Sequence, residues 1–296
     1  MKKFTQLLLI AVLLIGCSAT KTKNKAFNVL CPSGAPTLAF LSSYKDIVAD
    51  GKFDVVEGSD QLVAELSKSD SEYDVIVAPV NLGANLISKG KTDYRLHGIV
   101  TWGNLYLVGT KDALNQQGDI LLFGEGAVPS KIYEACQIDT KLKPVYMGEA
   151  SLVSADLASG KASVGMLAEP LASATMAKAK KQNINLEVLA DLQEIYATKQ
   201  GNGESGYPQA AVFVKKGVDI SWLEENLTAY TQDMSEAATY LDDIGVETLG
   251  LPAKEMVIAS LDKQNVKYRK ASEVKAELTQ FLVLFGIDFS DEMLDD

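Results

Sequence analysis

Short apolar runs alternate with amphipathic stretches over the first two thirds of the chain. The segment 26–33 predicts a strand, and 36–50 has apolar side chains at helical spacing. The segment 73–80 is almost continuously apolar, which is typical of a strand buried on both faces of a parallel sheet. Because strand and helix keep alternating at this spacing, we expect βαβ units and an α/β fold with mostly parallel sheets flanked by helices.

The apolar run 94–111 is longer than an ordinary strand of about five or six residues. Gly103 interrupts this run, which suits a chain that passes from one lobe to another. The alternation then restarts, and the loop-like segment 197–208 precedes a strand over 209–216 that we interpret as the return crossing. Two crossings predict two lobes. The expected boundaries are 26–101 with 209–296 for lobe I, and 102–208 for lobe II.

The remaining C-terminal part reads as mostly helical. Its first long amphipathic stretch, 221–243, predicts one helix. Ser221 is the candidate N-cap, and Glu224 three residues later completes a capping box. A second helix is expected over 272–286.

The first 17 residues follow a basic, apolar and small-residue pattern that is typical of a secretory signal. Its apolar core, 7–15, is too short to span a membrane, which takes about 20 residues. The string LIGC resembles the bacterial lipobox, which implies that Cys17 becomes the lipidated first residue of the mature chain. We therefore expect a signal peptide over 1–16, a polar leash over 17–25, and a lipid anchor at the extracytoplasmic face of the cell membrane. An ordinary cleaved signal with a chance cysteine is the alternative.

Charge narrows the choice of partners. The net charge is −11, and removing 1–16 takes away two lysines and no acid, which leaves −13. This acidic balance argues against nucleic acid as a partner. Only Arg95 and Arg269 are arginine, so bidentate clamps for carboxylate or phosphate are scarce. The scarcity favours a neutral, zwitterionic or cationic ligand.

The few cysteines and the single histidine limit the possible disulfides and metal sites. Cys31 and Cys136 lie in apolar contexts, where they either pair or, as we favour, remain two small buried side chains. His97 is the only histidine and no Cys-x-x-Cys pair is present, so a transition-metal site is not expected. The string GEGA is far from a full dinucleotide or P-loop motif, and no cofactor is expected.

Three strings carry a resemblance to the solute-binding proteins of ABC importers: PSGAPTLAF after the first strand, LAEPLA after a strand of lobe II, and GYPQAAVFVKK at the return crossing. Together with the two crossings, they resemble the type 2 periplasmic-binding branch that includes nitrate, taurine, aliphatic-sulfonate and thiamine-precursor binders. The resemblance covers nearly all of the mature chain. It implies a protein that delivers a small organic molecule to an ABC permease, and we expect a monomer.

In open α/β sheets, ligands bind outside the carboxyl ends of strands, next to helix N-termini. Trp102 and Tyr207 lie at the crossings, where an aromatic ring can either cover a flat ligand or pack between the lobes. Glu169 could meet a cationic or N–H-rich group or stabilise a helix end, and Asn81 could bind ligand or cap its helix. The predicted ligand-binding residues are Ser33, Gly34, Ala35, Asn81, Trp102, Gly124, Glu125, Gly126, Glu169 and Tyr207.

Catalysis needs a nucleophile, a base and an orienting group. Cys31 with His97 is the only thiol–imidazole combination that we consider. The pyrimidine synthases that resemble these binders carry a cysteine-rich motif that this chain lacks. We therefore expect no enzyme, and a surface lipoprotein with an adhesin or scaffold role is the alternative to a solute binder.

Overall fold

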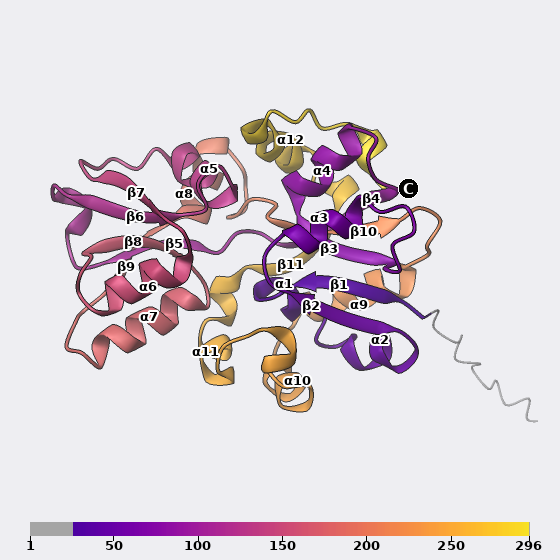
Figure 1. Cartoon of the computed structure of the whole chain (residues 1–296), viewed down its shortest axis with the longest axis horizontal. Helices are drawn as coiled ribbons and strands as arrows, with labels where there is room; N and C mark the ends of the chain where they lie inside the picture. Colours follow the sequence, from indigo (N-terminus) through magenta and orange to yellow (C-terminus); the bar gives the residue numbers. More distant parts are fainter. Residues whose placement is uncertain (1–25, 296) are drawn as a thin grey trace, which may run out of the picture.

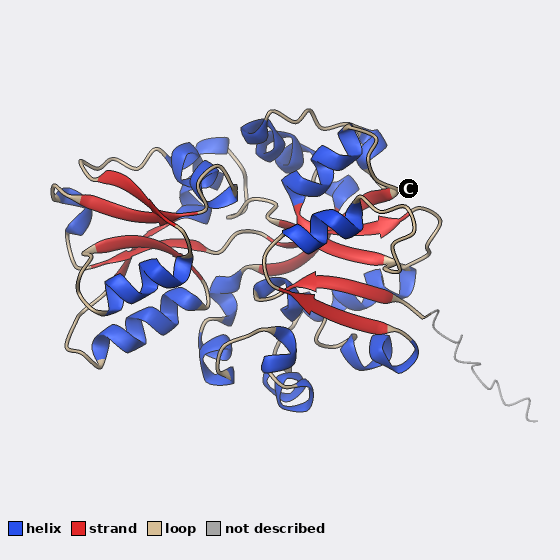
Figure 2. Cartoon of the chain, in the orientation of Figure 1, coloured by secondary structure: helices blue, strands red, loops and turns tan. Residues whose placement is uncertain are grey.

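The computed structural model describes residues 26–295, and the predicted signal peptide, leash and Cys17 lie outside this range. Two α/β lobes are joined by crossing segments, with lobe II on the left of Figure 1 and lobe I on the right. Lobe I contains the six-stranded sheet β11-β4-β10-β3-β1-β2, and lobe II the five-stranded sheet β7-β6-β8-β5-β9. Helices cover both faces of each sheet (Figure 2).

The strands of lobe I are β1 (Asn28–Pro32), β2 (Lys52–Val56), β3 (Val75–Pro79), β4 (Tyr94–Thr101), β10 (Ala210–Lys215) and β11 (Val266–Lys270). Those of lobe II are β5 (Leu105–Gly109), β6 (Asp119–Phe123), β7 (Lys143–Met147), β8 (Val164–Ala168) and β9 (Glu187–Asp191). The helices of lobe I are α1 (Ala35–Leu38), α2 (Tyr44–Asp50), α3 (Asp60–Leu66), α4 (Val80–Ser88), α9 (Ser221–Gln232), α10 (Ala237–Ile244), α11 (Lys254–Ala259) and α12 (Lys275–Leu282). Those of lobe II are α5 (Val128–Cys136), α6 (Ala150–Ala158), α7 (Leu171–Lys180) and α8 (Leu192–Gln200).

Short 3-10 helices complete the described chain. They are η1 (Ala113–Asn115), η2 (Glu247–Leu249), η3 (Leu261–Gln264), η4 (Ala271–Glu273), η5 (Val283–Phe285) and η6 (Asp291–Met293). Within residues 26–295, no helix has the length and apolar character needed to cross a membrane.

The α/β class and the two lobes are confirmed, but both sheets are mixed where mostly parallel ones were expected. In lobe I, β1 pairs in parallel with β2 and β3, whereas β10 is antiparallel to β3 and β4, and β11 is antiparallel to β4. In lobe II, β6 is parallel to β7 and β8, whereas β5 is antiparallel to β8 and β9. Four of the five antiparallel pairs involve β5 and β10, the first strands after the chain changes lobes, and the fifth is formed by the edge strand β11.

Two predicted helices are divided in the structure. The stretch 36–50 forms α1 and α2 with a turn between them, where two adjacent serines favour a break. The stretch 221–243 forms α9 and α10, because the carboxylate of Asp233 accepts the backbone N–H of Ser235 (3.0 Å) and so competes with the helix. The expected capping box is wrong as well. Ser221 donates its N–H (3.0 Å) and its hydroxyl (2.6 Å) to the Asp219 carboxylate instead of capping α9.

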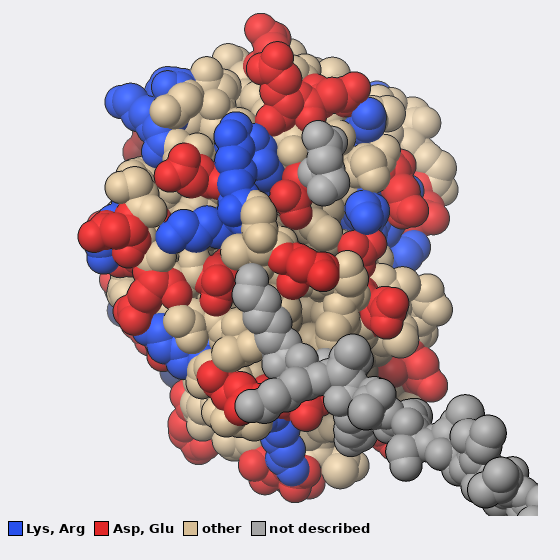
Figure 3. Space-filling model, turned by 90° about the vertical axis from the view of Figure 1, so that its right-hand side faces the viewer, with Lys and Arg blue, Asp and Glu red and all other residues tan. Residues whose placement is uncertain are grey.

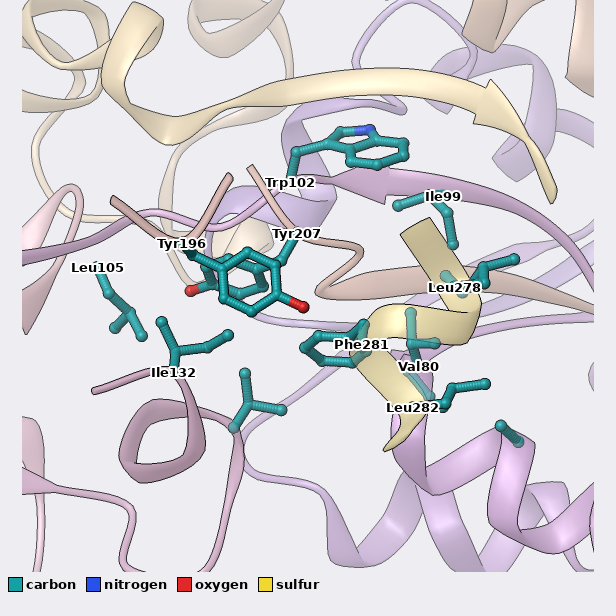
Figure 4. Close-up of a cluster of buried hydrophobic side chains, with 14 of the residues drawn as sticks. Val80, Ile99, Trp102, Leu105, Ile132, Tyr196, Tyr207, Leu278, Phe281 and Leu282 are labelled. Carbon is teal, nitrogen blue, oxygen red and sulfur yellow. The ribbon is translucent and has the colours of Figure 1, made fainter. Parts of the chain in front are cut away.

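The largest apolar core continues from lobe I into lobe II at the crossings. Figure 4 shows Tyr207 between Tyr196 of α8 and Phe281 of α12. The rings of Tyr207 and Phe281 are stacked, with centroids 5.8 Å apart and planes inclined by 8°. Tyr196 meets Tyr207 edge-on, with centroids 5.5 Å apart. Direct aromatic packing therefore joins the two lobes.

Candidate functional site

The carboxyl ends of the strands in the two lobes face each other. In lobe II, Ala168 at the end of β8 lies opposite Leu105 at the start of β5, so the turns after β8 and its parallel neighbour β6 face lobe I. In lobe I, β3 and β4 both end beside Ala210, where β10 returns from lobe II. The predicted turns of the two lobes thus lie on facing edges, as a ligand site between the lobes requires.

The predicted residues of lobe I form open turns at this edge. Gly34 has φ +93°, and a Cβ added to it would have no neighbour within 4 Å. Its carbonyl accepts the N–H (3.0 Å) and the hydroxyl (2.8 Å) of Thr37, while the Ser33 N–H donates to Val56 (2.9 Å). Ala35 begins α1 and is buried. Asn81 is half-buried in the first turn of α4 and does not cap that helix.

The turn before α5 in lobe II is built from glycines in left-handed conformation. Gly124 has φ +68° and Gly126 has φ +72°, and both flank the exposed Glu125. A Cβ on Gly124 would approach Pro129 to 2.9 Å, whereas a Cβ on Gly126 would meet nothing within 4 Å. This geometry fits a plain strand-to-helix turn and also leaves the backbone open to a ligand.

Glu169 is only 3% exposed and stabilises the beginning of α7. Its carboxylate accepts the Ser173 N–H (3.1 Å) and hydroxyl (2.8 Å). These bonds correspond to the second of the two expected roles, in which Glu169 stabilises a helix end. Its backbone exchanges two hydrogen bonds with Asn104, each 2.9 Å long. Within residues 26–295, no Lys, Arg or His forms an ion pair with Glu169. A buried carboxylate without a cation is costly, so a positive group at this position would stabilise it.

Trp102 braces the outgoing crossing. Its backbone carbonyl accepts the Tyr207 N–H (3.0 Å) and the side-chain amide of Asn265 (2.9 Å). Its indole N–H donates to the Lys267 carbonyl (2.8 Å), and the guanidinium of Arg269 lies over its ring at 5.1 Å. The side chain is 5% exposed and borders a hollow of about 200 Å³ between β11 and the segment 202–206.

The hollow and the facing turns lie on opposite sides of the crossings. In lobe I, β11 is the edge strand next to β4, whereas β1 and β2 lie beyond β3 on the other side. The ion pair between Lys267 of β11 and Glu204 of the segment after α8 (2.8 Å) links the corresponding edges of the two lobes. In this conformation, Trp102 therefore borders the β11 side rather than the cleft.

The expectation that both crossing aromatics face the cleft is likewise not met at Tyr207. Its side chain has no exposed surface, because Phe281 and Tyr196 enclose it. Burial is also the main cause that raises the pKa of Tyr207 well above its ordinary value. The structure thus shows the packing alternative for this residue, while ligand contact by either aromatic stays a prediction.

This architecture recurs in solved structures. An ABC transporter protein from Parabacteroides distasonis is 22% identical, with a TM-score of 0.74, over 92% of this chain and 99% of that one. The chain has the two-lobed fold of a type 2 periplasmic binding protein. The periplasmic aliphatic sulphonate binding protein SsuA from Escherichia coli matches with 15% identity and a TM-score of 0.63, over 92% of each chain. The alkanesulfonate-binding protein SsuA from Xanthomonas axonopodis pv. citri, bound to MOPS, matches with 14% identity and a TM-score of 0.56, over 91% of this chain and 96% of that one. No protein-family model and no curated protein matches the sequence.

Sequence reasoning missed two polar side chains in the crossing segments. The amide oxygens of Asn104 and Gln209 are buried and accept no hydrogen bond from residues 26–295. Both residues belong to crossings that are otherwise apolar. A lone amide within the run 94–111 was the available signal, because a polar residue in a buried strand needs a reason to be there.

The two cysteines of the described chain are packed in apolar clusters, and the histidine is hydrogen-bonded to carboxylates. Cys31 and Cys136 are unpaired, and they lie in separate apolar clusters. His97 has one ring nitrogen 2.9 Å from the Glu224 carboxylate and the other 3.0 Å from Asp295. It thereby ties β4, α9 and the C-terminal segment together. In the described part of the chain, no group of three or more His, Cys, Asp or Glu is placed to hold a metal ion.

Surface charge on the distal face of lobe I is mixed. Figure 3 shows basic and acidic side chains interspersed on this face, without a broad patch of one sign. Such a surface offers no concentrated basic footprint of the kind that a phosphate backbone attracts.

Proposed function

We propose that this protein is an extracytoplasmic, lipid-anchored solute-binding protein that delivers a small organic molecule to an ABC permease. The observation that carries the proposal is the pair of lobes whose strand ends face each other across two crossings. Ligands of open α/β sheets bind at such strand ends, and two lobes on a hinge can close around a small molecule. The structures of similar fold that are described as sulfonate-binding proteins add support.

In this proposal the ligand bridges the two lobes. Lobe I comprises 26–101 with 209–296, and lobe II comprises 102–208. The turn 33–35 and Asn81 contact the ligand from lobe I, while the turn 124–126 and Glu169 contact it from lobe II. Trp102 and Tyr207 hold the crossings on which the lobes move.

The anchor is a separate part of the proposal, supported by the string LIGC. Lipidation of Cys17 would place the soluble lobes at the membrane, close to a permease, and two acyl chains hold stably where one is marginal. The chain is proposed to act as a monomer, since nothing in the binding role requires a second copy.

Release of a bound small molecule tests the binding function. Protein lacking residues 1–25 is exchanged into buffer, incubated with an extract of rich growth medium, separated by gel filtration and denatured, and the released compounds are identified by mass. The binder account expects one compound to be retained and, when added back, to raise the melting temperature, because a ligand that binds only the folded state stabilises it by mass action. A scaffold or adhesin would retain none and would show no such shift.

A further inference from the structure

An acidic residue stands at every strand end of lobe II that faces lobe I. Glu125 follows β6, Glu149 follows β7, Glu169 follows β8, and β9 itself ends on Asp191. Burial, followed by the charges of Asp191 and Glu169, raises the pKa of the nearby Tyr106. The facing edge of lobe II is therefore negatively polarised.

No basic residue balances these carboxylates from the turns at the same edges. The turns 33–34 and 57–59 and the first turn of α4 in lobe I contain no Lys or Arg. The turns 124–127 and 148–149 of lobe II contain none either. An oxyanion placed between the lobes would thus meet carboxylates without the arginine or lysine that usually compensates its charge.

A second, independent observation concerns the crossings themselves. Asn104 is 95% buried, since only 5% of it is exposed, and its side-chain oxygen has no hydrogen-bond partner in the described chain. Its orientation is fixed, because the amide nitrogen already donates to the Glu169 carbonyl (2.9 Å). The free atom next to Glu169 is therefore an acceptor that needs a donor.

Two further unpaired acceptors belong to lobe I. The side-chain oxygens of Gln209 and Asn81 are buried without a partner among residues 26–295. Their backbones are neighbours, because the N–H of Val80 donates to the Gln209 carbonyl (3.1 Å) and the N–H of Gln209 donates to Thr101 (3.0 Å). The unpaired oxygens of Gln209 and Asn81 thus belong to neighbouring backbone positions of lobe I, and that of Asn104 belongs to a residue bonded to the Glu169 backbone in lobe II.

Resting on the proposed function, we infer that the ligand is a small organic cation that carries at least two N–H groups, such as an amine, an amidine or a protonated heterocycle. Its charge compensates Glu169, and its N–H groups donate to the amide oxygens of Asn104, Gln209 and Asn81. This chemistry differs from that of sulfonate, which presents only acceptor oxygens to the protein.

The compound retained in the release experiment tests this inference first. We expect a molecule that is positively charged at pH 7 and has two or more N–H donors. A retained sulfonate, nitrate or phosphate compound would overturn the inference and leave the proposed function standing. Retention of no compound by the folded protein would overturn the proposed function, and the inference with it.

Two variants of one residue then test the contact by calorimetric titration with the retained compound. Gln209→Met keeps the length of the side chain but removes the acceptor, and should weaken binding about tenfold, the loss expected for one hydrogen bond to a charged group. Gln209→Glu keeps an acceptor and adds negative charge, so it should bind at least as tightly as the parent. Weaker binding by Gln209→Glu than by Gln209→Met would contradict a cationic ligand.

Gln116→Met is the matched control. Gln116 is exposed and follows η1, beyond the end of β5 that points away from the crossing. Its affinity should equal that of the parent. Thermal unfolding of each variant in the absence of ligand separates a loss of binding from a loss of folding. If Gln116→Met and Gln209→Met weakened binding equally, a ligand contact at Gln209 would be refuted.

Discussion

Replacing Trp102 by phenylalanine should weaken the junction between the lobes. The substitution keeps an aromatic ring at the outgoing crossing, but it removes the indole N–H that donates to the Lys267 carbonyl (2.8 Å). It also reduces the ring surface that lies under the Arg269 guanidinium at 5.1 Å. The Trp102 side chain is only 5% exposed, whereas Lys267 is an exposed residue beside the hollow, so water can partly replace the lost hydrogen bond.

The expected loss follows from these contacts. The hydrogen bond to the Lys267 carbonyl is only part-buried, so its loss should cost about 1 kcal/mol. A cation–π contact of this kind contributes roughly 0.5–1 kcal/mol. Together, the two losses should lower the free energy of unfolding of Trp102→Phe by about 1–2 kcal/mol.

Urea unfolding followed by far-UV circular dichroism measures this change, with Trp222→Phe as the matched control. Trp222 is half-buried and stacks on Phe27 with centroids 6.3 Å apart, and its indole N–H makes no hydrogen bond within residues 26–295. We expect this control to lose less than about 1 kcal/mol, because no buried polar group loses its partner. If Trp102→Phe were no more destabilising than Trp222→Phe, the bracing role of Trp102 would be refuted.

Three further predictions concern other parts of the chain. Burial raises the pKa of the Cys31 thiol well above its ordinary value and that of Cys136 to about 12. In the chain that lacks residues 1–25, and therefore Cys17, intact mass should show no alkylation by iodoacetamide at pH 8 until the protein is unfolded; rapid labelling of the folded protein would disagree. The hydrogen bond and charge of Lys267 lower the pKa of Glu204, so the pair stabilises the protein above the ordinary pKa of glutamate and loses this effect as the pH falls through the lowered value. Both side chains are exposed, so Glu204→Gln should cost only a few tenths of a kcal/mol at pH 7 and less at pH 3 in urea titrations, and an equal cost at both pH values would speak against the pair. Cys17→Ala should leave the precursor unprocessed or shed it from the membrane, whereas a processed variant that still partitions into detergent would argue against lipidation.

The sequence was sufficient for the order of most strands and helices, because most of the buried elements are locally apolar and are separated by clear turns. It did not predict α8, whose last residues, 197–200, were assigned to the loop-like segment. The edge strand β11 was missed, since its segment VKYRK alternates charged and apolar residues and is too short to stand out. The break between α9 and α10 depends on a side-chain contact of Asp233, which competes locally with the helix without changing its apolar stripe.

The candidate site was only partly predictable. The turns after the strands were found, because glycine and polar residues after an apolar run mark strand ends in an α/β fold. The environment of Tyr207 was not, since its stacking partner Phe281 comes from α12, far along the chain, although Tyr196 lies in the preceding helix α8. Whether an aromatic residue at a crossing meets a ligand or another ring is decided by such long-range packing.

The distance between the lobes shows whether a ligand binds between them. Pulsed electron resonance measures this distance between spin labels on Asp60→Cys of α3 and Ser151→Cys of α6, which are exposed positions on opposite lobes. The chain used lacks residues 1–25 and keeps the buried Cys31 and Cys136. The account predicts that the retained compound narrows the distance distribution and shifts it to shorter values, because the ligand bridges both lobes. A distribution that stays unchanged at saturating compound would contradict binding between the lobes.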